Sequence, residues 1–188
     1  MCPASPRPPA PLRPARRADS PRLAELMHTS VLELFPRFYD ERQTASAAVH
    51  VAHLDPALIE DGTYFVLEIG GELVACGGWS RRGKLYSGSG DREDDARLLD
   101  PLTEPARVRA MFVRGDWTRR GLGRTILEAC ERAAGAEGFR TLALMATLPG
   151  EPLYLAFGFR VVERTALEMP DGVMIEGVAM ERPIDPSA

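Results

Sequence analysis

The sequence contains almost no lysine, few cysteines and no long apolar run, and each shortage narrows what the protein can be. Lys84 is the only lysine among 23 basic residues, a bias that carries little functional weight. The three cysteines, Cys2, Cys76 and Cys130, are widely spaced and form no Cys-x-x-Cys pair, which argues against a disulfide framework and a zinc site. A reducing cytoplasm is therefore the expected setting, and no metal is expected.

No stretch approaches the roughly 18 consecutive apolar residues that are needed to span a bilayer, so no membrane association is expected. The formal net charge is -4 and the isoelectric point is near 5.5. This acidic balance argues against a broad nucleic-acid surface. A local cluster of arginines can still hold one small, phosphorylated ligand.

The length of 188 residues fits one domain, which can bury roughly two-thirds of its unfolded surface in a single core. Residues 1–11 are proline-rich and lack the apolar core of a signal peptide, which predicts a disordered tail. The remaining residues, 12–184, are expected to form the single domain.

Hydrophobic periodicity predicts an α/β chain without internal repeats. This prediction rests on apolar positions at helical spacing and on two apolar runs around the Gly70-Gly71 turn. It also rests on a helix start in which Ser20 is the N-cap and Pro21 lies in the first turn. Helices are expected over residues 21–34, 43–53, 122–137 and 152–157. Strands are expected over residues 12–16, 64–69, 72–80, 107–113, 141–146, 160–168 and 173–181. The charged, turn-rich stretch 81–105 is expected to form an exposed loop.

The most informative motif joins the apolar strand ending at Val113 to a helix that opens with Arg119-Arg120-Gly121-Leu122-Gly123-Arg124. The first N–H groups of a helix have no intrahelical partner and lie at the positive end of its dipole. The two glycines remove side chains that would keep a phosphate away, and the arginines add donors. The motif therefore predicts an anion site at the start of this helix.

Two better-known phosphate motifs do not match, because Ile126 stands where a dinucleotide fingerprint needs glycine and the Gly-Lys-Ser/Thr of a P-loop is absent. The segment instead resembles the Arg/Gln-x-x-Gly-x-Gly/Ala loop of the GCN5-related N-acetyltransferase (GNAT) family. Thr118 replaces the long polar side chain usual at its first position, so backbone amides and the arginines are expected to hold the phosphates. Leu153-Tyr154-Leu155-Ala156-Phe157-Gly158-Phe159 resembles the ending of a second family signature, and the resemblance covers roughly residues 11 to 184.

The resemblance implies a mixed, mostly antiparallel sheet flanked by helices, in which two central parallel strands splay apart. Those strands correspond here to residues 110–113 and 142–147. The pantetheine arm of acetyl-CoA lies between them in the family and bonds to backbone groups, and CoA leaves as the product. The residues implied to bind the cofactor are Met111, Phe112, Val113, Arg119, Arg120, Gly121, Leu122, Gly123, Arg124 and Thr147. For the first three, only the backbone is implied, since their side chains suit a core.

Tyr154 matches the family's tyrosine near the CoA sulfur, which can donate a proton to the departing thiolate. An unperturbed tyrosine, with a pKa near 10, is protonated at neutral pH as a general acid must be. The alternative is an aromatic packed between Phe157 and Phe159. No residue stands out as a general base. Those considered, none favoured over a water chain, are Glu68, Glu104, His28, His50 and His53.

The function expected from this resemblance is acetyl-CoA-dependent N-acetylation of a primary amine on a small molecule. The amine attacks the thioester directly in a ternary complex, which agrees with the absence of a Gly-x-Ser-x-Gly elbow. Transfer to a protein N-terminus or lysine and a CoA-binding domain without turnover are the alternatives. Trp79 and Tyr86 are candidates for the acceptor pocket. The two C-terminal strands often mediate dimers in similar proteins, so a homodimer is also expected.

Overall fold

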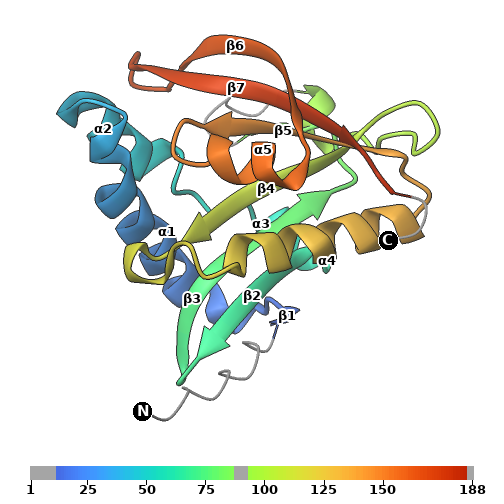
Figure 1. The fold of residues 1–188 in the computed structure, drawn as a ribbon, viewed down its shortest axis with the longest axis horizontal. Helices are drawn as coiled ribbons and strands as arrows, with labels where there is room; N and C mark the ends of the chain where they lie inside the picture. Colours follow the sequence, from blue (N-terminus) through green and yellow to red (C-terminus); the bar gives the residue numbers. More distant parts are fainter. Residues whose placement is uncertain (1–11, 87–92, 186–188) are drawn as a thin grey trace, which may run out of the picture.

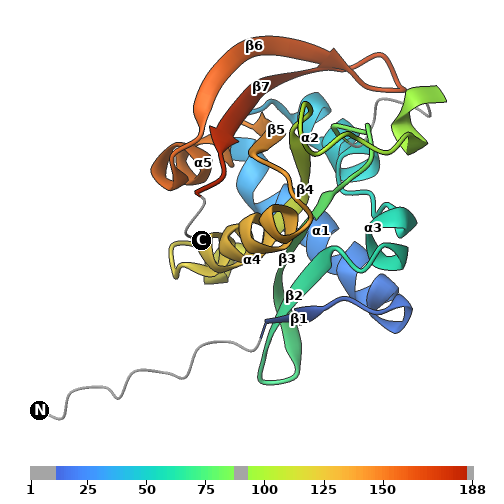
Figure 2. The ribbon, with the colours of Figure 1, turned by 90° about the vertical axis from the view of Figure 1, so that its right-hand side faces the viewer.

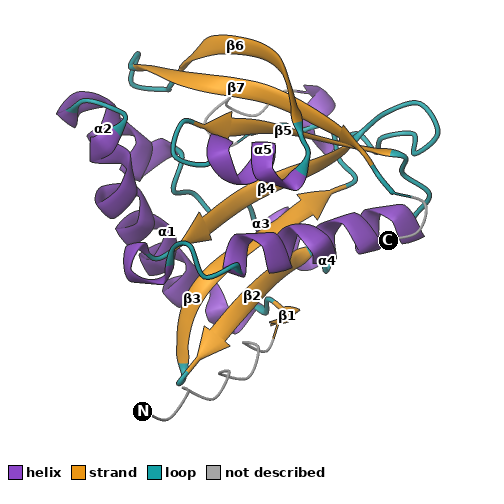
Figure 3. Ribbon diagram, viewed as in Figure 1, coloured by secondary structure: helices purple, strands orange, loops and turns teal. Residues whose placement is uncertain are grey.

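A computed structural model describes residues 12–86 and 93–185, so the predicted tail over residues 1–11 lies outside the described part. The described chain forms one seven-stranded sheet in the order β1-β2-β3-β4-β5-β7-β6, with helices packed against it (Figures 1 and 3). The strands are β1 (Leu12–Pro14), β2 (Tyr64–Ile69), β3 (Glu72–Ser80), β4 (Ala106–Val113), β5 (Thr141–Thr147), β6 (Arg160–Glu168) and β7 (Met174–Pro183). The helices are α1 (Ser20–Leu34), α2 (Glu41–His50), α3 (Pro56–Glu60), α4 (Leu122–Ala136) and α5 (Glu151–Phe157).

Neighbouring residues of one strand point to different cores on the two faces of the sheet. Val66 packs with side chains of α1, α2 and α3, whereas Leu67 packs with those of α4 and α5. Figure 2 shows α4 on one side of β2 and β3, and α1 and α3 on the other. This period-two alternation is what a strand covered on both faces requires.

Among the described strands, parallel pairing occurs only between β4 and β5, and it is short. The paired residues are Ala106 with Leu142 and Arg107 with Ala143, after which the two strands diverge. Ala110 has a φ of 52°, a left-handed conformation that interrupts the regular strand just before Met111. The structure thus confirms the predicted mixed sheet with splayed central strands.

Several helix starts differ from the prediction. Helix α2 ends at His50, not at residue 53, and begins at Glu41, not at residue 43, because Asp40 caps it by accepting a hydrogen bond from Gln43 N. Ser20 is the first residue of α1 and not its N-cap, which is Asp19, and no side-chain hydrogen bond caps this helix. The short helix α3 was not among the predicted helices. In the structure Asp55 accepts a hydrogen bond from Ala57 N at 3.0 Å, and Pro56 occupies the first turn. Asp-Pro is a helix-start signal that a five-residue helix uses without any apolar periodicity.

The predicted loop 81–105 carries some regular structure in its described part. A 3-10 turn spans Glu93–Ala96, and Arg82 forms an isolated antiparallel bridge with Leu98. Among the described residues, none of the helices combines the length and apolar composition needed to cross a bilayer.

Asp19, at the start of α1, pairs with Arg13 of β1. The contribution of this pair to the stability of the fold should depend on pH. The residue Asp19 is 6% exposed, and its carboxylate accepts hydrogen bonds from Arg13 Nη1 and Nη2 at 2.7 and 2.9 Å. The Arg13 hydrogen bonds outweigh burial and lower the pKa of Asp19 from 3.8 to about 2. A carboxylate whose pKa is lower in the folded state stabilises the fold above its unfolded pKa, and loses this contribution as pH falls through the folded value.

We therefore expect Asp19→Asn to lower the free energy of unfolding by about 2 kcal/mol at pH 7. The difference from wild type should shrink as the pH falls from about 4 to about 2. Urea unfolding of both proteins at pH 7 and at pH 2.5 measures this. An equal difference at both pH values would contradict the assignment.

Candidate active site

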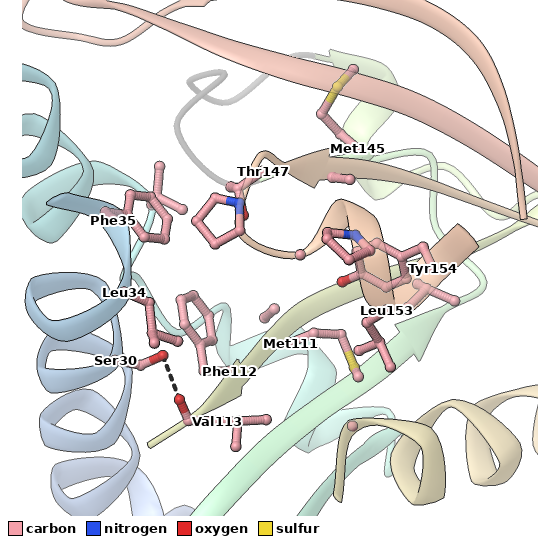
Figure 4. Close-up of a pocket in the computed structure, with 18 of the residues that line it drawn as sticks. Ser30, Leu34, Phe35, Met111, Phe112, Val113, Met145, Thr147, Leu153 and Tyr154 are labelled. Atoms are coloured by element: carbon pink, nitrogen blue, oxygen red, sulfur yellow. Dashed lines mark hydrogen bonds between the residues drawn. The ribbon is translucent and has the colours of Figure 1, made fainter. Parts of the chain in front are cut away.

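A cavity of about 590 Å³ opens where β4 and β5 diverge. It lies between the two cores, so different helices supply its two walls. Figure 4 shows Leu34 and Phe35 on the α1 side, Leu153 and Tyr154 on the α5 side, and Phe112 between them. The divergence of two central strands therefore leaves an opening that reaches the interior of the sheet.

The backbone of β4 presents two residues to this opening. Arg114 N donates to Val74 O at 3.0 Å, so by strand alternation Phe112 also directs its N–H and C=O to β3. Met111 and Val113 consequently point theirs toward the gap, where β5 no longer pairs with β4. The C=O of Val113 accepts a hydrogen bond from Ser30 Oγ at 2.8 Å (Figure 4). The remaining gap-facing groups of Met111 and Val113 lie at the cavity wall, whereas Phe112 contributes its side chain.

The N-terminus of α4 forms one end of the cavity, through Gly121, Leu122 and Gly123. Gly121 is the N-cap with a φ of 81°, and no side chain caps the helix. Residues other than glycine rarely adopt this left-handed conformation. Gly123 is needed for a different reason, because a Cβ at this position would come within 2.7 Å of Leu153 Cδ2. Its small size thus also permits the close packing of α4 on α5.

The three arginines of the motif take separate positions. Arg119 and Arg124 line the cavity, and Arg119 makes no hydrogen bond or ion pair with any described residue. Arg124 Nε lies 3.2 Å from Glu128 Oε1, one helical turn further along α4. Arg120 is turned away: its Nη2 donates to Asp116 O at 2.9 Å and its guanidinium lies 4.5 Å from the Trp117 ring centre. Only two of the three predicted arginines therefore face the cavity.

Tyr154 directs its hydroxyl into the cavity (Figure 4) and is 7% exposed. The hydroxyl makes no hydrogen bond to any of the described residues, and the ring packs edge-on against Phe159 at 5.8 Å. Burial raises the pKa of Tyr154 well above its usual value, so the group stays protonated at neutral pH. The residue is both a packed aromatic and an available proton donor. Thr147, at the end of β5, lies on the same cavity wall.

None of the five residues considered as a general base lines the cavity. Glu68 Oε2 accepts a hydrogen bond from Arg13 Nη2 at 2.9 Å, and His50 Nε2 lies 3.5 Å from Asp171 Oδ2. Hydrogen bonds from Arg97 lower the pKa of Glu104 to about 2. His28 and His53 are exposed. Within the part of the chain that the structure describes, no three His, Cys, Asp or Glu side chains gather as a metal site would need.

The two aromatic candidates for the acceptor pocket separate in the structure. Tyr86 lines the cavity. Trp79 does not, because it is buried on the α4 side of the sheet against Phe139, with the ring centres 5.8 Å apart. Trp79 is therefore a core residue.

Two further arrangements around the cavity have no signature in the sequence. The Tyr39 hydroxyl donates to Glu176 O at 2.7 Å and accepts from Leu148 N at 2.9 Å, which ties β7 to the exit of β5. Arg109 Nη1 donates to Asp55 Oδ2 at 2.8 Å, while its Nε and Nη2 are buried without a hydrogen bond. These contacts join residues that lie far apart in the chain.

Comparison with known proteins agrees with this geometry. A family model described as an acetyltransferase (GNAT) domain matches residues 60–161, more than half of the chain. No curated protein sequence matches the chain. Solved structures with the same fold include a GCN5-related N-acetyltransferase from Rhodopseudomonas palustris, with 21% identity, a TM-score of 0.70 and coverage of 93% of this chain and 96% of that one.

Two other similar structures contain a cofactor. One is the PaiA N-acetyltransferase from Thermoplasma acidophilum in complex with coenzyme A, with 14% identity, a TM-score of 0.64 and coverage of 92% and 98% of the two chains. The other is yncA from Salmonella typhimurium with its cofactor acetyl-CoA, with 17% identity, a TM-score of 0.61 and coverage of 94% of each chain. At these identities the likeness establishes the fold.

Proposed function

The chain belongs to the GNAT family of acetyltransferases, and from this premise we propose that it transfers an acetyl group from acetyl-CoA to the primary amine of a small molecule. One observation carries the proposal. A single cavity connects the uncapped start of α4, the gap-facing backbone of β4 and the hydroxyl of Tyr154. The same cavity therefore contains a site for an anion, backbone groups that can hydrogen-bond to an amide, and a proton donor.

The residues present fit a CoA-type cofactor. The N–H groups at the start of α4, with Arg119 and Arg124, suit its phosphates. The gap-facing backbone groups of Met111 and Val113 suit the amides of its pantetheine arm, because buried backbone groups need partners. Gly121, Leu122, Gly123 and Thr147 complete the walls. Phe112 enters this assignment through its side chain, and Arg120 supports the turn.

Acetyl-CoA, when bound, supplies an acetyl thioester. In the transfer, the amine nitrogen of the acceptor forms a bond to the acetyl carbon as the carbon–sulfur bond breaks. The amine loses one proton to water, and the Tyr154 hydroxyl donates one to the departing sulfur and regains one from solvent. The protein contributes orientation of the two reactants and a positioned acid.

Two arginines that are adjacent in sequence provide a matched test of the cofactor site. Arg119→Ala should weaken CoA binding by about tenfold or more, because it removes charge-assisted hydrogen bonds to phosphate. Arg120→Ala should leave the dissociation constant within about twofold, since Arg120 faces Asp116 and Trp117. Isothermal titration with CoA and acetyl-CoA measures both variants.

Equal losses in the two variants would contradict the assignment of Arg119, and no binding by the wild type would contradict the proposed function itself. Thiol release in the presence of amines then separates an enzyme from a CoA-binding domain without turnover. A peptide substrate that is preferred over every small amine would instead favour the protein-directed alternative. The homodimer stays a prediction that sedimentation velocity can measure.

A further inference from the structure

The half of the cavity opposite Tyr154 is apolar. We call it the acceptor lobe, and its walls come from α1, α2, β7 and the end of β6. Its defining side chains are Leu34, Phe35, Val51, Leu167, Met169 and Ile175. Phe35, Met169 and Ile175 are buried, and the other three are partly buried against the same core. Figure 4 shows Leu34 and Phe35 on the wall that faces Tyr154 across the cavity.

Ser30 and Arg109 are polar residues that line the cavity, and neither presents a free charged group to the lobe. Ser30 donates its hydroxyl to Val113 O. The charge of Arg109 is matched by Asp55, to which its Nη1 donates a hydrogen bond. Its Nε and Nη2 make no hydrogen bond, but both atoms are buried and so present no donor at the surface of the lobe. Neither group therefore offers a ready partner to an ion in the lobe.

Glu176 is the only carboxylate among the described residues that line the cavity, and it faces the other way. Ile175 packs into the core beneath the lobe, so the next residue on β7 points to the opposite face. Glu176 is exposed there, close enough to Arg164 to interact electrostatically with it. The lobe thus has no described carboxylate for a second ammonium group of an acceptor.

From this arrangement we infer that the acceptor is a primary amine carried on an uncharged, apolar body. This inference rests on the proposed function and names the substrate class of the same site. An apolar body gains from burial against the six side chains. A carboxylate or a second ammonium on the acceptor would enter the lobe without a partner among the described residues, which is strongly unfavourable. Amino acids and polyamines are consequently disfavoured.

The first experiment compares 2-phenylethylamine with phenylalanine, which adds only a carboxylate, and with spermidine, which adds further charges. Binding to the CoA-saturated protein and kcat/KM with acetyl-CoA are measured for each. We expect 2-phenylethylamine to exceed both others by about 100-fold in kcat/KM. A preference for phenylalanine or spermidine would overturn the inference, as would no detectable binding of 2-phenylethylamine at millimolar concentration.

The second experiment places a carboxylate in the lobe. Leu34→Glu should lower kcat/KM for 2-phenylethylamine at least tenfold and raise the relative rate with spermidine. Leu32→Glu is the control, because Leu32 lies in the same last turn of α1, is 48% exposed and does not line the cavity. Both variants should bind CoA as the wild type does.

This CoA measurement separates the two levels of the argument. Loss of CoA binding by the wild type would refute the proposed function, whereas normal CoA binding with an unchanged amine preference in Leu34→Glu would refute the acceptor class alone.

Discussion

Tyr154→Phe should lower kcat by about 100-fold or more, which is within the range for removal of a positioned general acid. The Tyr154 hydroxyl is directed into the cavity and hydrogen-bonds to no described residue, so its loss leaves no protein group unpaired. The phenyl ring can keep the edge-on packing against Phe159. CoA affinity and the melting temperature should therefore change little, while turnover falls.

Steady-state rates of thiol release, with CoA titrations as the control, test this expectation. Burial raises the pKa of Tyr154 above its usual value, so the acid stays protonated and the wild-type kcat should show no loss from this group up to about pH 10. An unchanged kcat in Tyr154→Phe would show that water protonates the thiolate and that Tyr154 is only a packed aromatic.

Asp55→Ala should lower the free energy of unfolding by about 3–5 kcal/mol. The Arg109 side chain is 2% exposed, and Asp55 is its hydrogen-bonded partner in the described structure. Removing the carboxylate leaves a buried guanidinium unpaired, and it also removes the cap of α3 at Ala57 N. Burial alone would raise the pKa of Asp55, but the hydrogen bond and charge of Arg109 hold it below its usual value. The pair therefore stabilises the fold at neutral pH and loses this effect in acid.

Glu60→Ala is the matched control, because Glu60 is the last residue of α3, the helix that Asp55 caps. Glu60 pairs with Arg17, whose side chain is 81% exposed. This exposed pair should contribute within about 0.5 kcal/mol. Denaturant unfolding measures both variants. A double variant with Arg109→Met should regain much of the stability lost in Asp55→Ala, since the unpaired charge is then removed. Similar small losses for Asp55→Ala and Glu60→Ala would show that Arg109 finds other partners.

Local sequence patterns predicted most of the fold because they report on backbone geometry directly. The Gly70-Gly71 turn, the stripe of α4 and the strand runs are local, and the structure confirms these elements. Helix α3 was missed because five residues are too few to show a periodicity. The Ser20 cap was misplaced by one residue because Asp19, engaged by Arg13, takes that position.

The site was less predictable, since it depends on directions that sequence does not encode. Arg119 and Arg120 are equivalent as letters, but a positive φ of 59° at Arg119 turns them to different sides. Phe112 alternates with its neighbours, so its backbone faces β3 rather than the gap. Ser30 and Tyr39 bond to backbone groups 83 and 137 residues away, and no local pattern indicates such contacts.

The two-residue pairing between β4 and β5 has a mechanical consequence. The sheet has two parts, one formed by β1 to β4 and the other by β5, β7 and β6. Among the described strands, the two parts are joined within the sheet only by this short pairing. A ligand whose amides bond to Met111 and Val113 would supply the hydrogen bonds that β5 does not make to this part of β4. Catalysis would then be a cycle in which the sheet is completed when the ligand enters and is opened again when the spent ligand leaves.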